Sequence, residues 1–543
     1  MSRLFATTRR DVTGHLPPGQ RLLVRAGYVC PAQGGALVEL PAGVRLREII
    51  TRRVLRTLPE DAQMIGLPTE REGAERSTLP PALMHVIKQH VRTYRQLPQT
   101  LYRTFHLAAQ QGNAQAGLLA PHTSFILEVY HLEAHDADAE LRYQAQVEGF
   151  TKALTEMGIR APLVIPDDGG VPEARRAHSV AVLLPTGPDT LARCPSCGQA
   201  FRPSLAPFRR PEPPQEHMQP LTKVETPGAN TIRGLTAFLE IPASRTAKVV
   251  FYMARLLRNG AEEEALVVAL VRGDMGVSEA KLRQAVHAWA LRPAEAEEIR
   301  AVGAVPGFAS PVGLPREGIL VVVDELVARS PNLVAGANEP DTHYLNVNAG
   351  RDYTPDVVAD IALAPSGAPC VTCGTPLERA SAVLVGQFAG PAGREPGGPV
   401  ATFAADDGSR RPVWLNFFRF DISRLMGLLA EAHHDEHGLC WPPGLAPYDV
   451  HLVRLGKEAE FVDLAERLYA ALREAHLSVL YDDRDAGAGV KFTDADLVGA
   501  PLQVTVAPRA LRQGGVEFKV RATGERRLIA PEDVVEAVRA HVA

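Results

Sequence analysis

Long apolar runs and cysteine are both scarce in this sequence of 543 residues. No run reaches the roughly 20 consecutive apolar residues that a membrane-spanning helix needs. The N-terminal segment also lacks the apolar stretch of a signal peptide. We therefore expect a cytoplasmic protein without a membrane partner, in which the thiols stay reduced. Six cysteines in so long a chain are then not a disulfide framework.

A strong excess of charge of either sign is missing as well. The formal net charge of −5 argues against a generally basic nucleic-acid-binding surface, although a local basic face is still allowed. Hydrophobic residues at 45% and charged residues at 22% are ordinary for a globular protein. Because the chain is longer than one hydrophobic core usually supports, we expect three or four domains.

Two stretches rich in proline and glycine, residues 203–220 and 390–399, predict loops. Between residues 224 and 364 short apolar strands alternate with helices, and a similar alternation follows Pro447. This order is typical of α/β domains. Helical periodicity predicts further helices at residues 43–58, 81–96, 139–157 and 424–433.

Four of the cysteines form two pairs with the same spacing. Cys194 and Cys197 are separated by two residues and followed by glycine, as are Cys370 and Cys373. This spacing turns both sulfurs of a pair toward one metal ion, and two such pairs predict a structural zinc site with four thiolates. The pairs are too far apart for a simple zinc ribbon, so we expect a whole domain inserted between its halves. The alternative to a shared zinc site is that the two Cys-x-x-Cys segments are unrelated turns with reduced thiols.

Short motifs near both ends of the chain resemble those of one family. They lie at residues 22–28, 40–45, 94–98, 435–442, 446–447, 482–484, 489–492 and 496–501. In order, these segments are similar to the motifs of the class II catalytic core and of the anticodon-binding domain in bacterial-type prolyl-tRNA synthetases. The resemblance covers nearly the whole chain in the family's domain order.

The resemblance implies a multidomain fold that combines α/β and α+β parts. It comprises a class II core with an antiparallel sheet, an inserted α/β editing domain like the YbaK and ProX deacylases, zinc-ribbon-like knuckles and a C-terminal α/β anticodon-binding domain. It also implies a homodimer that forms through the core. The expected boundaries are 1–193 and 381–445 for the core, 194–220 and 367–380 for the knuckles with the linker, 221–366 for the editing domain and 446–543 for the anticodon-binding domain.

The expected aminoacylation site departs from the family. The second motif has Ala109 and Gln111 where the family has arginine and glutamate, and residues 112–125 contain no arginine or lysine. In the third motif Arg424 is kept, but Arg419 and Asp421 replace two glycines that lie against the nucleotide. Activation by ATP needs positive charge beside the phosphates. We therefore expect no ATP cofactor and no useful activation of proline.

The inserted domain keeps residues of the family's editing site, which hydrolyses mischarged alanine. Lys248 matches the lysine that deacylation requires, and Asp324 and His343 resemble residues of the pocket. The alternatives are a solvated surface lysine, a helix cap for Asp324 and a structural histidine. Ser310 replaces a glycine, which leaves the preferred amino acid open. The loops expected to surround the ester are at Pro306, Gly307, Gly336, Ala337 and Asn338.

In the C-terminal domain, Arg484, Lys491, Lys519 and Arg521 predict a basic face for tRNA phosphates, with scattered surface charge as the alternative. The leading hypothesis is a synthetase paralogue that binds tRNA, expected to be proline tRNA, and clears mischarged aminoacyl-tRNA in trans. A non-catalytic protein that binds tRNA or another protein is the second hypothesis. A divergent but working proline–tRNA ligase is the third.

Overall fold

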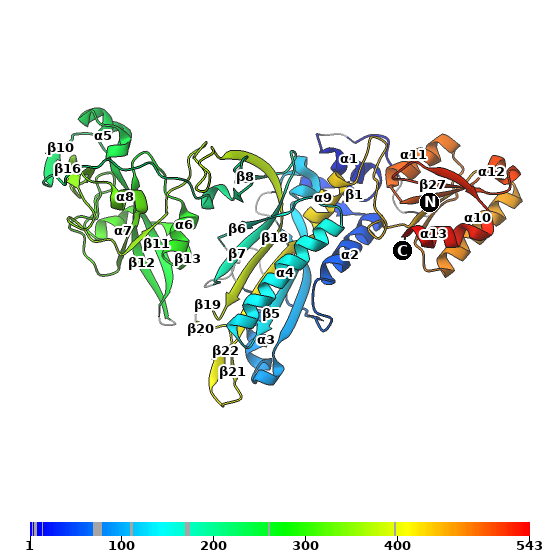
Figure 1. The fold of residues 1–543 in the computed structure, drawn as a ribbon, viewed down its shortest axis with the longest axis horizontal. Coiled ribbons are helices and arrows are strands. Elements are labelled where there is room, and N and C mark those ends of the chain that lie inside the picture. The colour runs from blue at the N-terminus through cyan, green and yellow to red at the C-terminus, as the bar shows by residue number, and fades with distance from the viewer. Residues whose placement is uncertain are drawn as a thin grey trace.

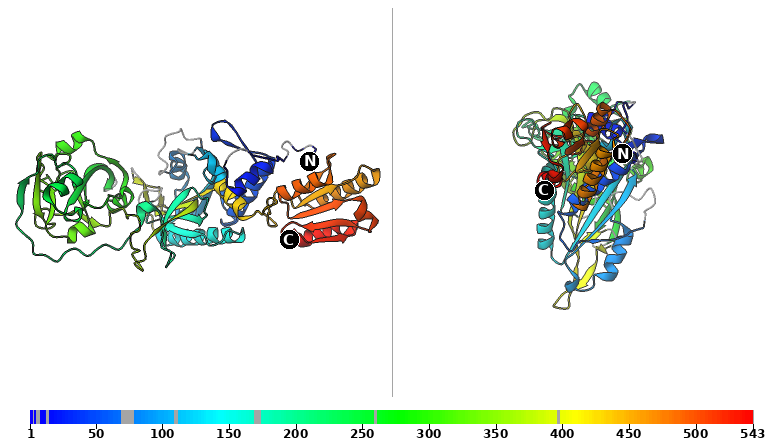
Figure 2. Two further views of the ribbon diagram at one scale, coloured as in Figure 1. Left: turned by 90° about the horizontal axis from the view of Figure 1, so that it is seen from above. Right: turned by 90° about the vertical axis from the view of Figure 1, so that its right-hand side faces the viewer.

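The protein is elongated, with the inserted domain and the C-terminal domain at opposite ends of a central core (Figures 1 and 2). This computed structural model describes residues 1–542, except 3, 5–7, 13–14, 69–78, 109–111, 169–173, 259–260 and 396–397. In the described part, none of the helices combines the length and the apolar character needed to cross a bilayer.

The core is built on a nine-stranded sheet in which every pairing is antiparallel except β3 with β4. Its order is β3-β4-β5-β23-β18-β7-β6, and β8 pairs with both β18 and β9. Phe150 of α4 packs on Phe388 and Phe420 of the sheet, with ring centroids 5.7 and 4.6 Å away. The strands are β3 (Gln63–Met64), β4 (Gln99–Ala108), β5 (Thr123–Glu133), β6 (Leu163–Pro166), β7 (Arg176–Leu183), β8 (Asp189–Arg193), β9 (Ala200–Phe201), β18 (Glu378–Ala392) and β23 (Trp414–Asp421).

Five helices and several short strands complete the core. Helices α4 and α9 lie along the sheet, whereas α1 and α2 lie nearer the C-terminal domain (Figure 1). The helices are α1 (Pro18–Arg25), α2 (Pro41–Leu55), α3 (Pro81–His90), α4 (Asp136–Glu156) and α9 (Ile422–Ala432). The short strands are β1 (Val29–Pro31), β2 (Leu37–Glu39), β19 (Arg394–Glu395), β20 (Gly398–Pro399), β21 (Thr402–Ala404) and β22 (Arg410–Pro412).

The inserted domain contains a five-stranded sheet, β13-β11-β12-β14-β17, and a three-stranded sheet, β10-β16-β15. Its strands are β10 (Thr222–Glu225), β11 (Ala247–Arg258), β12 (Ala261–Arg272), β13 (Ala288–Pro293), β14 (Ile319–Asp324), β15 (Leu333–Gly336), β16 (Thr342–Val347) and β17 (Val357–Ala359). Its helices are α5 (Ile232–Leu239), α6 (Glu279–Ala285), α7 (Ala296–Ala301) and α8 (Glu325–Arg329).

The C-terminal domain has a mixed sheet of order β25-β24-β26-β27-β28. Its strands are β24 (Val450–Arg454), β25 (Val479–Asp482), β26 (Leu502–Val506), β27 (Val516–Val520) and β28 (Arg526–Ile529). Its helices are α10 (Ala459–Glu474), α11 (Ala488–Val498), α12 (Pro508–Arg512) and α13 (Val534–Val542). The fold class expected from the sequence is confirmed for all three parts.

One predicted helix, residues 81–96, is too long. Helix α3 ends at His90. The side chain of Gln96 accepts hydrogen bonds from the backbone N–H groups of Arg92 and Thr93, at 2.7 and 2.9 Å. These bonds stabilise a separate turn and take over backbone donors that a continuous helix would have used.

Tyr28 and Trp441 join the core to the C-terminal domain. Both side chains are fully buried, and the Trp441 indole donates to the Tyr28 hydroxyl at 2.9 Å. The Tyr28 hydroxyl in turn donates to the Val498 carbonyl at 2.8 Å, at the end of α11. Burial raises the pKa of Tyr28 well above its usual range, so the phenol stays protonated and can donate.

Replacing Tyr28 by phenylalanine should weaken this junction. The change leaves an indole N–H and a carbonyl without partners in a buried site, at a cost of about 1–3 kcal/mol in the free energy of unfolding. Urea denaturation followed by tryptophan fluorescence measures the change. Tyr94→Phe is the matched control, because Tyr94 is 40% exposed. If both variants change the free energy of unfolding equally, the Tyr28 hydrogen bonds do not stabilise this junction.

Candidate functional site

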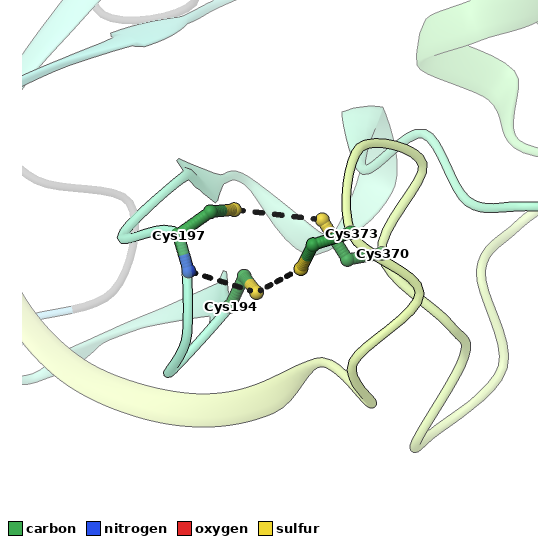
Figure 3. A group of neighbouring side chains, drawn as sticks. All are labelled: Cys194, Cys197, Cys370 and Cys373. Carbon is green, nitrogen blue, oxygen red and sulfur yellow. Dashed lines mark hydrogen bonds between the residues drawn. The ribbon is translucent and has the colours of Figure 1, made fainter.

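The four paired cysteines meet at one point between the core and the inserted domain (Figure 3). The Sγ atoms of Cys194 and Cys373 are 3.3 Å apart, and those of Cys197 and Cys370 are 3.7 Å apart. All four sulfurs lie within 4.8 Å of one another. Cys194 and Cys370 are buried, whereas Cys197 and Cys373 are exposed.

The cluster has the size of a tetrahedral metal site. Zinc–sulfur bonds of about 2.3 Å place the sulfurs of a tetrahedron about 3.8 Å apart. Gly198 and Gly374, with φ of 77° and 78°, turn the chain after each pair in the left-handed region that glycine favours. The donor set therefore fits a structural zinc ion. Four protein ligands leave no position for a substrate.

Lys248 and Asp324 lie in one row of the five-stranded sheet. Lys248 on β11 pairs with Val271 on β12. Leu270 and Val323 pair in parallel, so the next residues, Val271 and Asp324, continue the same row. Paired residues face the same side of a sheet. No described residue forms a hydrogen bond or ion pair with the Lys248 side chain, which leaves the ammonium group available.

His343 and Gly336 are paired where β15 meets β16. Thr246, two residues before Lys248, forms an isolated parallel bridge with Val334, two residues before Gly336. The His343 side chain is buried, and its Nδ1 lies 2.6 Å from the Thr226 hydroxyl. Burial lowers the pKa of His343, so the ring is neutral near pH 7. Strand pairing therefore places His343 opposite Gly336, and the isolated bridge brings the residues just before Lys248 next to β15.

The predicted ester-binding loops also converge at this junction. A side chain at Gly336 would overlap the Phe308 carbonyl, because a Cβ atom there would lie 2.0 Å from that oxygen. Asn338 donates its backbone N–H to the same carbonyl at 2.8 Å and accepts from the Ser310 N–H at 3.0 Å. Gly307 has a φ of 88° in the connecting turn. Asn338 thus fixes the loop that follows Pro306, and Ala337 lies between these contacts.

Asp324 has the contacts of a structural residue. It is fully buried and caps α8 by accepting from the Leu326 N–H at 3.1 Å. Its other oxygen accepts from Arg210 at 3.0 Å and from the N–H groups of Ile361 and Ala362 at 3.2 and 3.1 Å. This agrees with the helix-cap alternative. A carboxylate so fully bonded is not available as a catalytic base.

A cavity of about 340 Å³ lies in the core beside the third-motif segment. Arg419, Arg424 and Asp421 all line it. Arg419 contacts Glu128 through two nitrogens, at 2.8 and 2.7 Å. Arg424 lies 2.7 Å from Asp189 and 3.7 Å from Asp421. Ala109 and Gln111 of the second motif lie outside the described residues.

Asp421 places a carboxyl group in this cavity wall. It accepts from the Arg424 N–H at 2.9 Å and from the Ser124 hydroxyl at 2.8 Å. Burial raises its pKa, and the neighbouring Arg424 only partly offsets this effect. Arg202, the third arginine of the cavity, is bound to Asp167 at 3.0 Å. Each lining arginine is therefore paired with a carboxylate.

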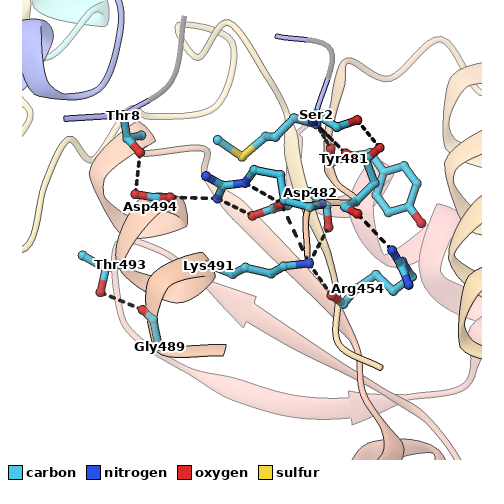
Figure 4. Close-up of polar contacts among 12 residues, drawn as sticks. Ser2, Thr8, Arg454, Tyr481, Asp482, Gly489, Lys491, Thr493 and Asp494 are labelled. Atoms are coloured by element: carbon cyan, nitrogen blue, oxygen red, sulfur yellow. Dashed lines mark hydrogen bonds and ion pairs between the residues drawn. The ribbon is translucent and has the colours of Figure 1, made fainter. Parts of the chain in front are cut away.

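The four residues predicted to form a basic face of the C-terminal domain are held in contacts within the protein. Arg484 bonds to Asp482 and Asp494. The buried Lys491 donates to the Arg454 and Asp482 carbonyls (Figure 4). The other two are also buried: Lys519 contacts Asp496 at 2.6 Å, and Arg521 contacts Asp435 at 2.6 and 2.7 Å. Removing one partner of such a buried pair would leave an uncompensated charge, so these residues are tied to the fold of the domain and to its junction with the core.

Sequence reasoning missed Thr226, Asp189 and Arg202 as members of these sites. Thr226 can be recognised only from its hydroxyl contact with His343. Asp189 and Arg202 are distant in sequence from the third motif, and no local pattern connects them to Arg424.

Comparisons with known proteins place these sites in a family. The family described as "Aminoacyl-tRNA editing domain" matches residues 226–353, and the family described as "Anticodon binding domain" matches residues 449–541. The proline–tRNA ligase of Salinispora tropica is 36% identical over 99% of this chain and 96% of its own length. The proline–tRNA ligase of Bacillus subtilis is 34% identical, with 98% of each chain covered.

A solved structure shares the fold. Prolyl-tRNA synthetase from Cryptosporidium parvum, complexed with halofuginone and AMPPNP, matches with a TM-score of 0.54 over 98% of this chain and 78% of that chain, at 10% identity. The sheet, the editing domain and the anticodon-binding domain thus define an aminoacyl-tRNA synthetase architecture. The chain belongs to the prolyl-tRNA synthetase family, as the sequence resemblance predicted.

The cysteine cluster should bind one zinc ion per chain. Cys370→Ser should reduce the zinc content by more than half, because it removes a buried thiolate ligand. Cys440→Ser is the matched control, since this free cysteine lies outside the cluster. Elemental analysis of the purified variants by mass spectrometry measures the content. An unchanged zinc content in Cys370→Ser would contradict the assignment.

Proposed function

We propose that this member of the family binds tRNA and hydrolyses mischarged aminoacyl-tRNA in its inserted domain, and that its core does not activate proline. The substrate is a proline tRNA that carries alanine or a similarly small amino acid, charged by another enzyme. The protein acts in the cytoplasm as a homodimer joined through the core, and a structural zinc ion occupies the cysteine cluster. The pairing of each described arginine of the core cavity with a carboxylate carries the proposal.

The charge distribution in the core supports the loss of activation. A nucleotide triphosphate needs uncompensated positive charge, because negative charge develops on the α-phosphate in the transition state. Arg419 is bound to Glu128, and Arg424 is shared between Asp189 and Asp421. To bind phosphate, Arg424 would have to leave two carboxylates, one of which would then face the phosphate.

The inserted domain keeps the parts that ester hydrolysis needs. The free ammonium group of Lys248 offers a cation for the tRNA end or for developing negative charge. Neutral His343, oriented by Thr226, supplies a polar group in a buried wall. Asn338 holds the loop whose backbone N–H groups would face the ester. Asp324 positions α8 and the linker rather than the ester.

A second candidate function is proline–tRNA ligation with a divergent site. The relatives named proline–tRNA ligase favour it, because their similarity extends over 98% or more of this chain. In that case a different set of cations would bind the nucleotide. Activity on proline decides between the two candidates.

Lys248→Ala should reduce hydrolysis of Ala-tRNA(Pro) by about 100- to 1,000-fold, as expected for the loss of one charge-stabilising donor. Release of radiolabelled alanine from the tRNA measures the rate. Lys223→Ala is the matched control: Lys223 pairs with Tyr344, so it faces away from the side that His343 shares with Val224. If the unmodified protein does not hydrolyse Ala-tRNA(Pro), the editing proposal is overturned.

Proline-dependent exchange of pyrophosphate into ATP should be undetectable with the unmodified protein. The described arginines that line the core cavity, Arg202, Arg419 and Arg424, are each held by a carboxylate, which weakens the stabilisation of the activation transition state. Exchange by Bacillus subtilis proline–tRNA ligase under the same conditions provides the positive control. Exchange at a comparable rate would establish the ligase candidate instead.

A further inference from the structure

Both chain connections of the inserted domain pass through the cysteine cluster. The chain leaves the core after Cys194 and Cys197 and returns at Cys370 and Cys373. Cys197 and Cys370 are 173 positions apart in sequence, yet their sulfurs are 3.7 Å apart. A metal ion held by these four thiolates therefore closes the base of the whole insertion.

The outgoing linker runs directly from this cluster into the inserted domain. Phe208 bridges Cys370, and the Arg209 N–H donates to the Pro369 carbonyl at 2.9 Å. The side chain of the next residue, Arg210, is only 7% exposed and binds Asp324 and Asp360. Its guanidinium also stacks on the Phe208 ring, 3.8 Å from the centroid. Three consecutive residues thus connect the metal site to the end of β14.

Lys281 of α6 binds both the outgoing and the returning linker of the inserted domain. Its ammonium donates to the carbonyls of Ala206 in the outgoing linker and of Ala362 in the returning one, both at 2.8 Å. It also contacts both oxygens of Asp360, at 3.1 and 3.0 Å. Lys281 is buried, so these bonds are made in a setting where an unpaired charge is costly.

Helix α6 also touches the core directly. Arg283 donates to the Asp168 carbonyl at 2.6 Å and lies 2.9 Å from its carboxylate. Gln284 donates to the Asp167 carbonyl at 3.2 Å. Helix α6 therefore contacts both linkers and also packs the inserted domain against the core, beside β6.

We infer that the metal ion of the cysteine cluster acts as a clamp that seats the inserted domain on the core. Arg210 is the positioning residue: its ion pair with Asp324 connects the linker beside the metal site to the inserted domain. With the ion bound, the two linkers lie side by side, so that Arg210 and Lys281 keep their partners. Without it, no metal–sulfur bonds join the two cysteine pairs, and the linkers can separate at their base. The inference concerns placement of the domain and rests on the proposed metal site rather than on catalysis.

The first experiment removes the metal from the full chain. Zinc is extracted with a chelator, and amide hydrogen exchange is measured by mass spectrometry. Peptides from the linkers, residues 203–212 and 360–370, and from α6 should exchange about tenfold faster or more, because local opening becomes easier. Peptides from β5 and β12 should keep their protection. Re-addition of Zn²⁺, but not Mg²⁺, should restore the slow exchange.

Two results would overturn the clamp. Unchanged exchange in the linkers and α6 after zinc loss would show that the ion does not hold the domain in place. Loss of protection throughout the chain would show that the metal supports the whole fold rather than the seating of one domain. Neither readout depends on hydrolysis, so failure of the editing proposal would leave this measurement intact.

The second experiment breaks the connection while leaving the ligands in place. Arg210→Met should speed exchange in residues 360–370 and α6 while the zinc content stays at one per chain. Arg210→Lys should partly restore protection, because it keeps a cation near Asp324 and Asp360. Arg316→Met is the control: it removes an exposed arginine that is paired with Asp356 in the same domain. Protection in Arg210→Met equal to that of the control would contradict a role for Arg210.

Discussion

The antiparallel pairing of β8 with β18 is the constraint on which the architecture depends. Glu378, at the start of β18, pairs with Arg193, at the end of β8. The cysteine pairs follow β8 and precede β18, so the strand register itself brings them together. A domain can be inserted at this point without distorting the core sheet, because its two connections begin as neighbours. Beyond this strand pair, three further features hold the two connections together. These are the metal site, the buried linker charges and the contact of α6 with the core.

Compensated charge is the common feature of the rest of the molecule. In the core cavity Arg419 and Arg424 are held by carboxylates, and in the C-terminal domain Arg484 and Lys519 are held in the same way. Removing one partner from a buried pair leaves an uncompensated charge, which is much more costly than losing an exposed pair. Such residues are therefore constrained by folding. In contrast, the Lys248 ammonium group pairs with no described residue, so no such partner constrains it.

The fold and the family were largely predictable from the sequence, and the cysteine cluster was as well. Periodicity and short motifs depend on local sequence, and the Cys-x-x-Cys spacing has few structural interpretations. Side-chain pairing was not predictable. Lys519 and Arg521 look like exposed cations in sequence, but their partners, Asp496 and Asp435, come from a helix and a loop elsewhere. Asp324 could be assigned as a cap only when its contact with Leu326 was seen.

The position of the insertion also fixes an order of events during synthesis. Strands β18 and β23, which fill the centre of the core sheet, are translated only after the inserted domain. The 173 positions between Cys197 and Cys370 correspond to a delay of about 10 to 35 seconds at ~5–20 residues per second. During that interval β5 and β7 lack their central neighbours and expose unpaired edges, which invite association with other chains. The inserted domain has its own hydrophobic core and can fold on the ribosome while the half-built sheet waits for its central strands.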